Sequence, residues 1–278
     1  MADPATPGPR KGIYFLPSLF TTAGLFFGFY AIIQATLGNF PNAAVAVLIA
    51  MIMDGLDGRV ARWTNTASDF GKEYDSLVDV IAFGVAPGMI IYFWSLQHLG
   101  KAGWLISFGF TAATALRLAR FNTMTTKENR YFFGLACPPA TAFIAFWVWN
   151  FHETGFTGSE LVGLSALVTL SMSLLMVSRI KYRSFKDLDP KNRIPFIVLL
   201  AIVGTIALIS FDPPRVLFVM ALTYALSGPT VFVFRWLKGG ERAPVFMDED
   251  EIESDEIPKD DSTNVEILDP KKKPSAKR

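Results

Sequence analysis

Long apolar stretches alternate with short polar ones along the first 238 residues of the chain. A helix needs about 20 mostly apolar residues to cross a bilayer, and several stretches have or approach that length. They cover residues 16–37, 41–56, 76–95, 103–119, 136–151, 160–178, 194–211 and 214–236. Polar residues extend the second and third at one end, as expected for helices that continue into water. The pattern predicts an all-α integral membrane protein with about eight transmembrane helices.

The positions of Lys and Arg between these stretches predict an orientation. Up to residue 242, eighteen fall on one side of the expected membrane, and only Lys101 and Arg215 fall on the other. Basic residues are enriched in cytoplasmic loops, so the rich side and both termini should be cytoplasmic. We therefore expect a multi-pass protein of the cytoplasmic (inner) membrane.

The two ends of the chain differ from the apolar region between them. Residues 239–278 are acidic and then basic, and such a segment buries too little apolar area to fold, so we expect a disordered charged cytoplasmic tail. Residues 1–12 lack the basic-then-apolar order of a cleavable signal and should form a short cytoplasmic segment. The residues between these ends, 13–238, should form the transmembrane domain.

Composition narrows the classes of function. Charged residues make up 18% of the 278, against about 25% in soluble domains, which supports the membrane assignment. The net charge of +1 gives no reason to expect a nucleic-acid partner. The single cysteine, Cys137, excludes a disulfide framework within the chain and lies in an apolar stretch, where a small buried hydrophobe is the simplest interpretation.

Carboxylates inside membrane helices are rare and costly, so a cluster of them indicates a functional site. Asp54 and Asp57 are three residues apart and share one face of a helix, while Asp75 and Asp79 are four apart on the next helix. The polar residues 65–68 join these helices by a short turn. All four carboxylates should therefore meet at the cytoplasmic edge of the membrane.

Four clustered carboxylates repel one another unless cations neutralise them. Mg²⁺ or Mn²⁺ prefers oxygen ligands, and two such ions can neutralise a pyrophosphate and orient an in-line displacement at phosphorus. For any single aspartate the alternative is a solvated helix cap, or a salt bridge with Arg59, Arg62 or Lys72. The alternative does not account for all four together.

The chain from residue 54 to residue 79 reads DGLDGRVAR, eight further residues, then GKEYDSLVD. It resembles, at every defining position, the CDP-alcohol phosphatidyltransferase motif D-x2-D-G-x2-A-R-x8-G-x3-D-x3-D. Stretches at residues 116–122, 131–140 and 176–186 are similar to those of the bacterial-type CDP-diacylglycerol–serine O-phosphatidyltransferases within that family. The resemblance spans about residues 12–210. The chain differs from the usual family pattern at Ser18 and at Ala136–Cys137.

The resemblance implies a six-helix core plus two helices, a homodimer, and the substrates CDP-diacylglycerol and L-serine, which react to phosphatidylserine and CMP. It implies two Mg²⁺ or Mn²⁺ ions, one held by Asp54, Asp57 and Asp75 and the second by Asp54, Asp75 and Asp79. Asp79 would also act as the general base that takes the proton of the serine hydroxyl. The residues that it implies for the CDP site are Gly58, Ala61, Arg62 and Gly71.

A site that selects serine should offer a cation to its carboxylate, and the guanidinium fork of arginine fits a carboxylate best. Arg117 and Arg120, at the expected cytoplasmic end of the fourth helix, are the candidates for acceptor binding. The alternative is that they anchor the helix at the membrane surface or contact lipid phosphate.

Rival functions remain open on the sequence alone. The nearest is the same chemistry with another acceptor, such as glycerol 3-phosphate, inositol or choline. A cation transporter would need carboxylates at mid-membrane on several helices, whereas here they gather at one edge on two. A scaffold without catalytic activity would not require the eight fixed positions of the motif.

Overall fold

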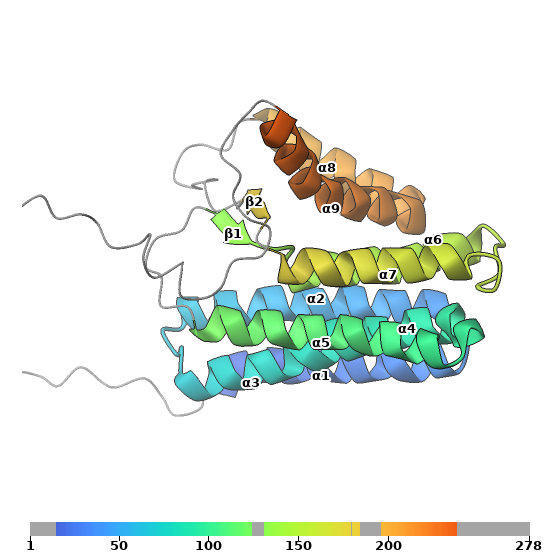
Figure 1. Ribbon diagram of the computed structural model, residues 1–278. Helices are drawn as coiled ribbons and strands as arrows, with labels where there is room; N and C mark the ends of the chain where they lie inside the picture. The colour runs from blue at the N-terminus through green and yellow to red at the C-terminus, as the bar shows by residue number, and fades with distance from the viewer. Residues whose placement is uncertain (1–14, 124–130, 179, 184–195, 238–278) are drawn as a thin grey trace, which may run out of the picture. The chain divides into compact units, whose positions relative to one another are not determined.

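The structure is a computed structural model that describes residues 15–123, 131–178, 180–183 and 196–237 (Figure 1). Its helices are α1 (Phe15–Thr36), α2 (Phe40–Trp63), α3 (Asp69–Asp79), α4 (Ala86–Trp94), α5 (Lys101–Thr123), α6 (Cys137–Glu153), α7 (Val162–Val177), α8 (Phe196–Phe211) and α9 (Pro213–Leu237). The predicted segment 1–12 and the predicted tail 239–278 lie outside the described residues. The described residues of the predicted apolar stretches are mainly helical, so the helical prediction is confirmed.

Four helices of the described chain are long and apolar enough to cross a membrane. They are Pro17–Thr36, Asp69–Trp94, Lys101–Thr123 and Pro213–Phe234. Large apolar side chains on the outer faces of these helices are exposed, including Phe26, Phe108 and Val219. Lipid would cover such surfaces, so length, composition and exposure together fit a membrane protein.

Helices α1 and α2 form a closely packed antiparallel pair. Buried alanines, among them Ala31, Ala35 and Ala43, line their contact and let the two backbones approach. Gly28 of α1 lies against Ala82, whose Cα would be only 2.9 Å from an added Cβ. Any larger residue at position 28 would therefore push α1 away from the segment that follows Asp79.

The helix that begins with α3 does not run regularly to the end of α4. A π-helical segment, η2 (Val80–Val85), joins the two, and the amide of Ala86 donates to the carbonyl of Ile81, five residues back. Pro87 explains the disturbance, because its ring lacks an N–H and crowds the carbonyl four residues earlier. That carbonyl belongs to Phe83, and it accepts a hydrogen bond from Thr141 of α6 at 2.5 Å. The apolar stretch 76–95 predicts one uninterrupted helix, and the structure differs from this prediction at η2.

A pair of three-residue strands was also not expected. β1 (Tyr131–Phe133) pairs antiparallel with β2 (Lys181–Arg183), with Phe132 opposite Tyr182. Gly134 follows β1 with φ +76, and an added Cβ would meet the carbonyls of Met176 and, at 2.7 Å, Ser178. Only glycine fits there, because it alone adopts this φ freely and has no Cβ. The strands therefore join two stretches that carry the family resemblance.

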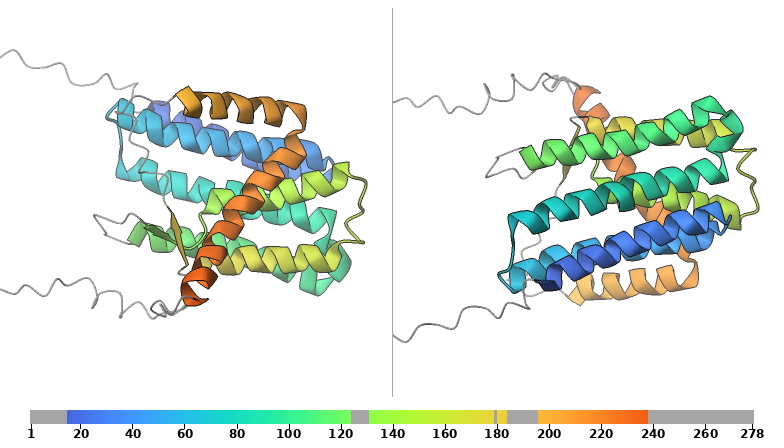
Figure 2. Two further views of the ribbon diagram at one scale, coloured as in Figure 1. Left: turned by 90° about the horizontal axis from the view of Figure 1, so that it is seen from above. Right: turned by 90° about the horizontal axis from the view of Figure 1, so that it is seen from below.

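Helix α6 lies at the centre of the packing, and its residues from Ala140 to Asn150 are all buried. Helix α9 crosses α6 at a steep angle, as Figure 2 shows. Phe218 of α9 contacts Phe143, Trp147 and Phe151 of α6, with ring centroids 5.7 to 6.0 Å apart. α8 packs against α9.

Candidate metal centre

A short turn between α2 and α3 positions the aspartates. Asn65 has a left-handed backbone conformation with φ 54, which Asn tolerates better than most residues. Ser68 then caps α3 by accepting a hydrogen bond from the amide of Gly71 at 3.1 Å. The chain thus reverses between Trp63 and Asp69, and α3 runs back past the last turns of α2.

This reversal brings together carboxylates from both helices. One oxygen each of Asp54, Asp57 and Asp75 lies within 4.8 Å of the others. Asp79 follows Asp75 by one helical turn, and all four aspartates line one cavity. The other residues around this cavity are Thr21, Gly24, Ala50, Val78, Ala82 and Phe83.

The aspartates have no cationic side chain to neutralise them within the described part of the chain. Its one salt bridge joins Arg215 to Asp212, and Arg59, Arg62 and Lys72 form none with the cluster. The Nε of Arg62 instead donates to the carbonyl of Gly58 at 3.0 Å. The salt-bridge alternative is therefore wrong for these residues.

The donor set fits a divalent cation. Asp57 is only 6% exposed and Asp54, Asp75 and Asp79 are partly buried, so water screens their repulsion poorly. Carboxylate oxygens are the ligands that Mg²⁺ and Mn²⁺ prefer. The cluster can hold such an ion between Asp54, Asp57 and Asp75.

The four residues predicted for the CDP site differ in how closely the chain packs around them. Gly58 is exposed, and a Cβ added there would meet no atom within 4 Å, so packing within the chain does not require glycine. Gly71 lies against its own cap, because an added Cβ would be 3.2 Å from the Ser68 hydroxyl. Ala61 is partly buried and Arg62 is exposed. Gly58 therefore leaves open space beside the carboxylates.

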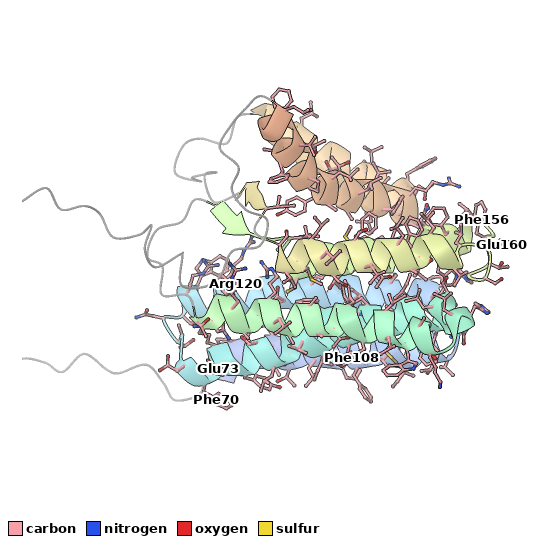
Figure 3. The ribbon with its side chains drawn as sticks, in the orientation of Figure 1. Phe70, Glu73, Phe108, Arg120, Phe156 and Glu160 are labelled. Atoms are coloured by element: carbon pink, nitrogen blue, oxygen red, sulfur yellow. The ribbon has the colours of Figure 1, made fainter. Side chains whose placement is uncertain are left out.

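The predicted arginines lie on α5, whose last turns reach the same end of the helices as the start of α3. Figure 3 shows Arg120 at this end with Phe70 and Glu73, and Phe156 and Glu160 at the opposite end. The side chain of Asn122 donates to Ser76 at 2.9 Å and so ties α5 to α3 beside Asp75.

Arg117 reaches from α5 to the start of α6. Its Nη1 donates to the Sγ of Cys137 at 3.4 Å, while its buried Nε has no hydrogen-bond partner among the described residues. Cys137 is buried, as the sequence predicted. Arg117 thus keeps hydrogen-bonding capacity that the described chain does not use.

Comparison with known proteins agrees with the motif. The sequence profile of the CDP-alcohol phosphatidyltransferase family matches residues 14–177. The chain belongs to this family. A CDP-diacylglycerol–serine O-phosphatidyltransferase of Helicobacter pylori (strain ATCC 700392 / 26695) is 38% identical over 82% of the chain and 94% of its own length. Enzymes of the same name from Bacillus subtilis and Methanocaldococcus jannaschii are each 31% identical, over 64% and 75% of the chain and 95% and 90% of their own lengths.

The residues that match the family contain the whole carboxylate cluster. Six helices of the described chain lie in them, from α1 to α7, when α3, η2 and α4 are taken as one continuous helix. Helices α8 and α9 lie beyond the match.

Two polar side chains near the cluster were not singled out from the sequence. Thr21 on α1 contacts Asp57, and Asn122 contacts the residue next to Asp75. Asn122 lies within the stretch 116–122 that carries the family resemblance. A threonine in an apolar helix gives no comparable signal, because its partner is 36 residues away in sequence.

Proposed function

We propose that this chain transfers the phosphatidyl group of CDP-diacylglycerol to L-serine and releases CMP. The convergence of Asp54, Asp57 and Asp75 within 4.8 Å of one another, inside the family motif, carries the proposal. The choice of donor and acceptor is supported by relatives that bear the name CDP-diacylglycerol–serine O-phosphatidyltransferase.

The proposed cofactors are two Mg²⁺ or Mn²⁺ ions. Asp54, Asp57 and Asp75 would hold one, and Asp54, Asp75 and Asp79 would hold the other. When bound, such ions neutralise the pyrophosphate of the donor and favour in-line displacement at phosphorus.

The side chains of the chain have separate tasks in this reaction. Gly58, Ala61, Arg62 and Gly71 line the nucleotide site, with open space above Gly58 for a flat base or ribose. Asp79 accepts the proton of the serine hydroxyl as its oxygen attacks the phosphorus that carries diacylglycerol. A bond from the serine oxygen to this phosphorus forms, the bond to the CMP oxygen breaks, and CMP leaves.

Acceptor choice is assigned to the arginines of α5. Arg117 presents a guanidinium with an unused buried Nε, and a carboxylate can receive two parallel hydrogen bonds from such a group. Arg120 lies one turn further along the same helix. Both would bind the serine carboxylate, while the serine hydroxyl points toward Asp79.

The proposal also covers the place of the enzyme in the cell. Residues 13–238 would form the membrane domain with eight crossings, flanked by the cytoplasmic segments 1–12 and 239–278. The active site would open to the cytoplasmic face of the inner membrane, and the enzyme would act there as a homodimer among membrane lipids.

An acceptor panel tests the function. Purified protein in lipid nanodiscs is given CDP-diacylglycerol, Mg²⁺ and one alcohol at a time, and CMP and the lipid product are quantified. We expect CMP and phosphatidylserine with L-serine, and no product with glycerol 3-phosphate, inositol or choline. Product with one of these but not with serine would change the acceptor, and no CMP with any alcohol would contradict the enzymatic proposal.

A further inference from the structure

The hydroxyl of Thr21 makes a buried contact with one aspartate of the cluster. Its Oγ1 lies 2.8 Å from Oδ2 of Asp57, and the two residues are 5% and 6% exposed. Thr21 belongs to α1, which contributes none of the four carboxylates, and it lines the same cavity. The contact therefore links a third helix to the cluster.

The proton of this hydroxyl has two possible acceptors. The carbonyl of Pro17 lies 3.2 Å from Oγ1, against 2.8 Å for the Asp57 carboxylate. A hydrogen bond to an ionised carboxylate is shorter and roughly twice as strong as one to a neutral group. The proton is therefore directed to Asp57 whenever that carboxylate is ionised.

We propose that Thr21 is a positioning residue for the metal centre, because its hydroxyl fixes the orientation of the Asp57 carboxylate. One oxygen of Asp57 is engaged by Thr21, which leaves the other for a cation shared with Asp54 and Asp75. Since both partners are buried, replacing the hydroxyl by an apolar group removes a hydrogen bond from a carboxylate oxygen that the solvent hydrates poorly. The inference rests on the proposed metal centre and assigns a function to a residue outside the family motif.

Three variants separate this role from ordinary packing. Thr21→Val keeps the branched shape but puts a methyl group against the buried carboxylate oxygen. Thr21→Ser keeps the hydroxyl and removes only a methyl group. Thr169→Val is the matched control, since Thr169 is a buried threonine of α7 whose hydroxyl donates only to the carbonyl of Ser165.

The test measures the affinity of each purified variant for Mn²⁺ with no substrate present. The concentration of free Mn²⁺ is determined by electron paramagnetic resonance. Removing a group that orients a metal ligand typically weakens metal affinity about 10- to 100-fold. We expect Thr21→Val to weaken Mn²⁺ binding in that range, and Thr21→Ser and Thr169→Val to bind like the unmodified chain.

The outcomes distinguish the role of Thr21 from the existence of the metal centre. Equal Mn²⁺ affinity in Thr21→Val and the unmodified chain, or an equal loss in Thr169→Val, would overturn the role of Thr21 alone. An unmodified chain that binds no Mn²⁺ would overturn the metal centre together with it. Thermal unfolding of each variant without metal is measured in parallel. If Thr21→Val does not fold, Thr21→Ala takes its place, because it also removes the hydroxyl. Mn²⁺ affinity of Thr21→Ala equal to that of the unmodified chain would overturn the proposal.

Discussion

The carboxylate side of the site, on α2 and α3, differs from the arginine side, on α5 and the start of α6. On the carboxylate side, helical spacing and a short turn fix three oxygens within 4.8 Å of one another, and Asp57 has a buried partner. On the arginine side, Arg117 donates a hydrogen bond to a weak acceptor, the sulfur of Cys137, and its buried Nε has no hydrogen-bond partner among the described residues.

This difference indicates how the work is divided. A set of ligands that is already assembled suits ions, which demand fixed geometry. An arginine with donors to spare suits a small substrate that enters and leaves. The carboxylate side should therefore determine whether the reaction occurs, and the arginine side which alcohol reacts.

The largest expected effect comes from breaking the carboxylate side. Asp57→Asn and Asp75→Asn keep the side-chain shape and remove one charge, and each should lower turnover by more than about 10⁴-fold, the most that a lost general base costs. CMP release by purified, membrane-inserted variants measures the loss. Asp69→Asn is the control, because Asp69 is the first residue of α3, the helix that carries Asp75, and is exposed. Near-normal turnover in either variant would remove that residue from the metal centre.

A smaller loss should follow at the point where the two sides meet. Asp79→Asn removes the proposed base, which should slow the chemical step about 10²- to 10⁴-fold. Donor affinity should stay within about tenfold, because Asp54, Asp57 and Asp75 still hold one ion. Single-turnover CMP release and CDP-diacylglycerol binding separate the two effects. Collapsed donor binding with an unchanged chemical rate would make Asp79 a binding residue.

Changing the arginine side should affect the acceptor selectively. Arg117→Met removes hydrogen bonding to the serine carboxylate. Loss of one hydrogen bond to a charged group costs about 1.5–3 kcal/mol, so KM for serine should rise at least about 10- to 150-fold. The affinity for CDP-diacylglycerol should not change. Arg59→Met, at an exposed position of α2, is the matched control. A loss of donor affinity in place of serine affinity would assign Arg117 to the nucleotide or lipid.

The smallest effect should come from a change to the C-terminal segment, which belongs to neither side of the site. Removing residues 243–278 should leave turnover within about twofold, because a charged terminal segment adds nothing to a buried site. CMP release per inserted molecule measures it. A tenfold loss would show that the segment takes part in the reaction.

The sequence predicted the carboxylate side well for a physical reason. Residues three or four apart on a helix share a face. The short turn at residues 65–68 constrains the two helices that it joins to lie side by side. The apolar stretches predicted the helices equally directly, because crossing a bilayer requires length and hydrophobicity.

Other features depend on partners that spacing cannot reveal. The strand pair joins Tyr131 to Arg183 across more than fifty residues. In the π segment, the carbonyl of Phe83 accepts its hydrogen bond from Thr141, 58 residues away in sequence. The contact of Thr21 with Asp57 likewise requires knowing how α1 lies against α2. Such long-range contacts follow from packing and not from a local pattern.

The most direct test of the central claim is a cation titration of the unmodified enzyme. The protein is stripped with EDTA, given saturating CDP-diacylglycerol and L-serine, and titrated with Mn²⁺ while bound ions and CMP are both measured. The account predicts no turnover without cation, and full recovery as two ions bind per chain. Full turnover in excess EDTA would contradict it.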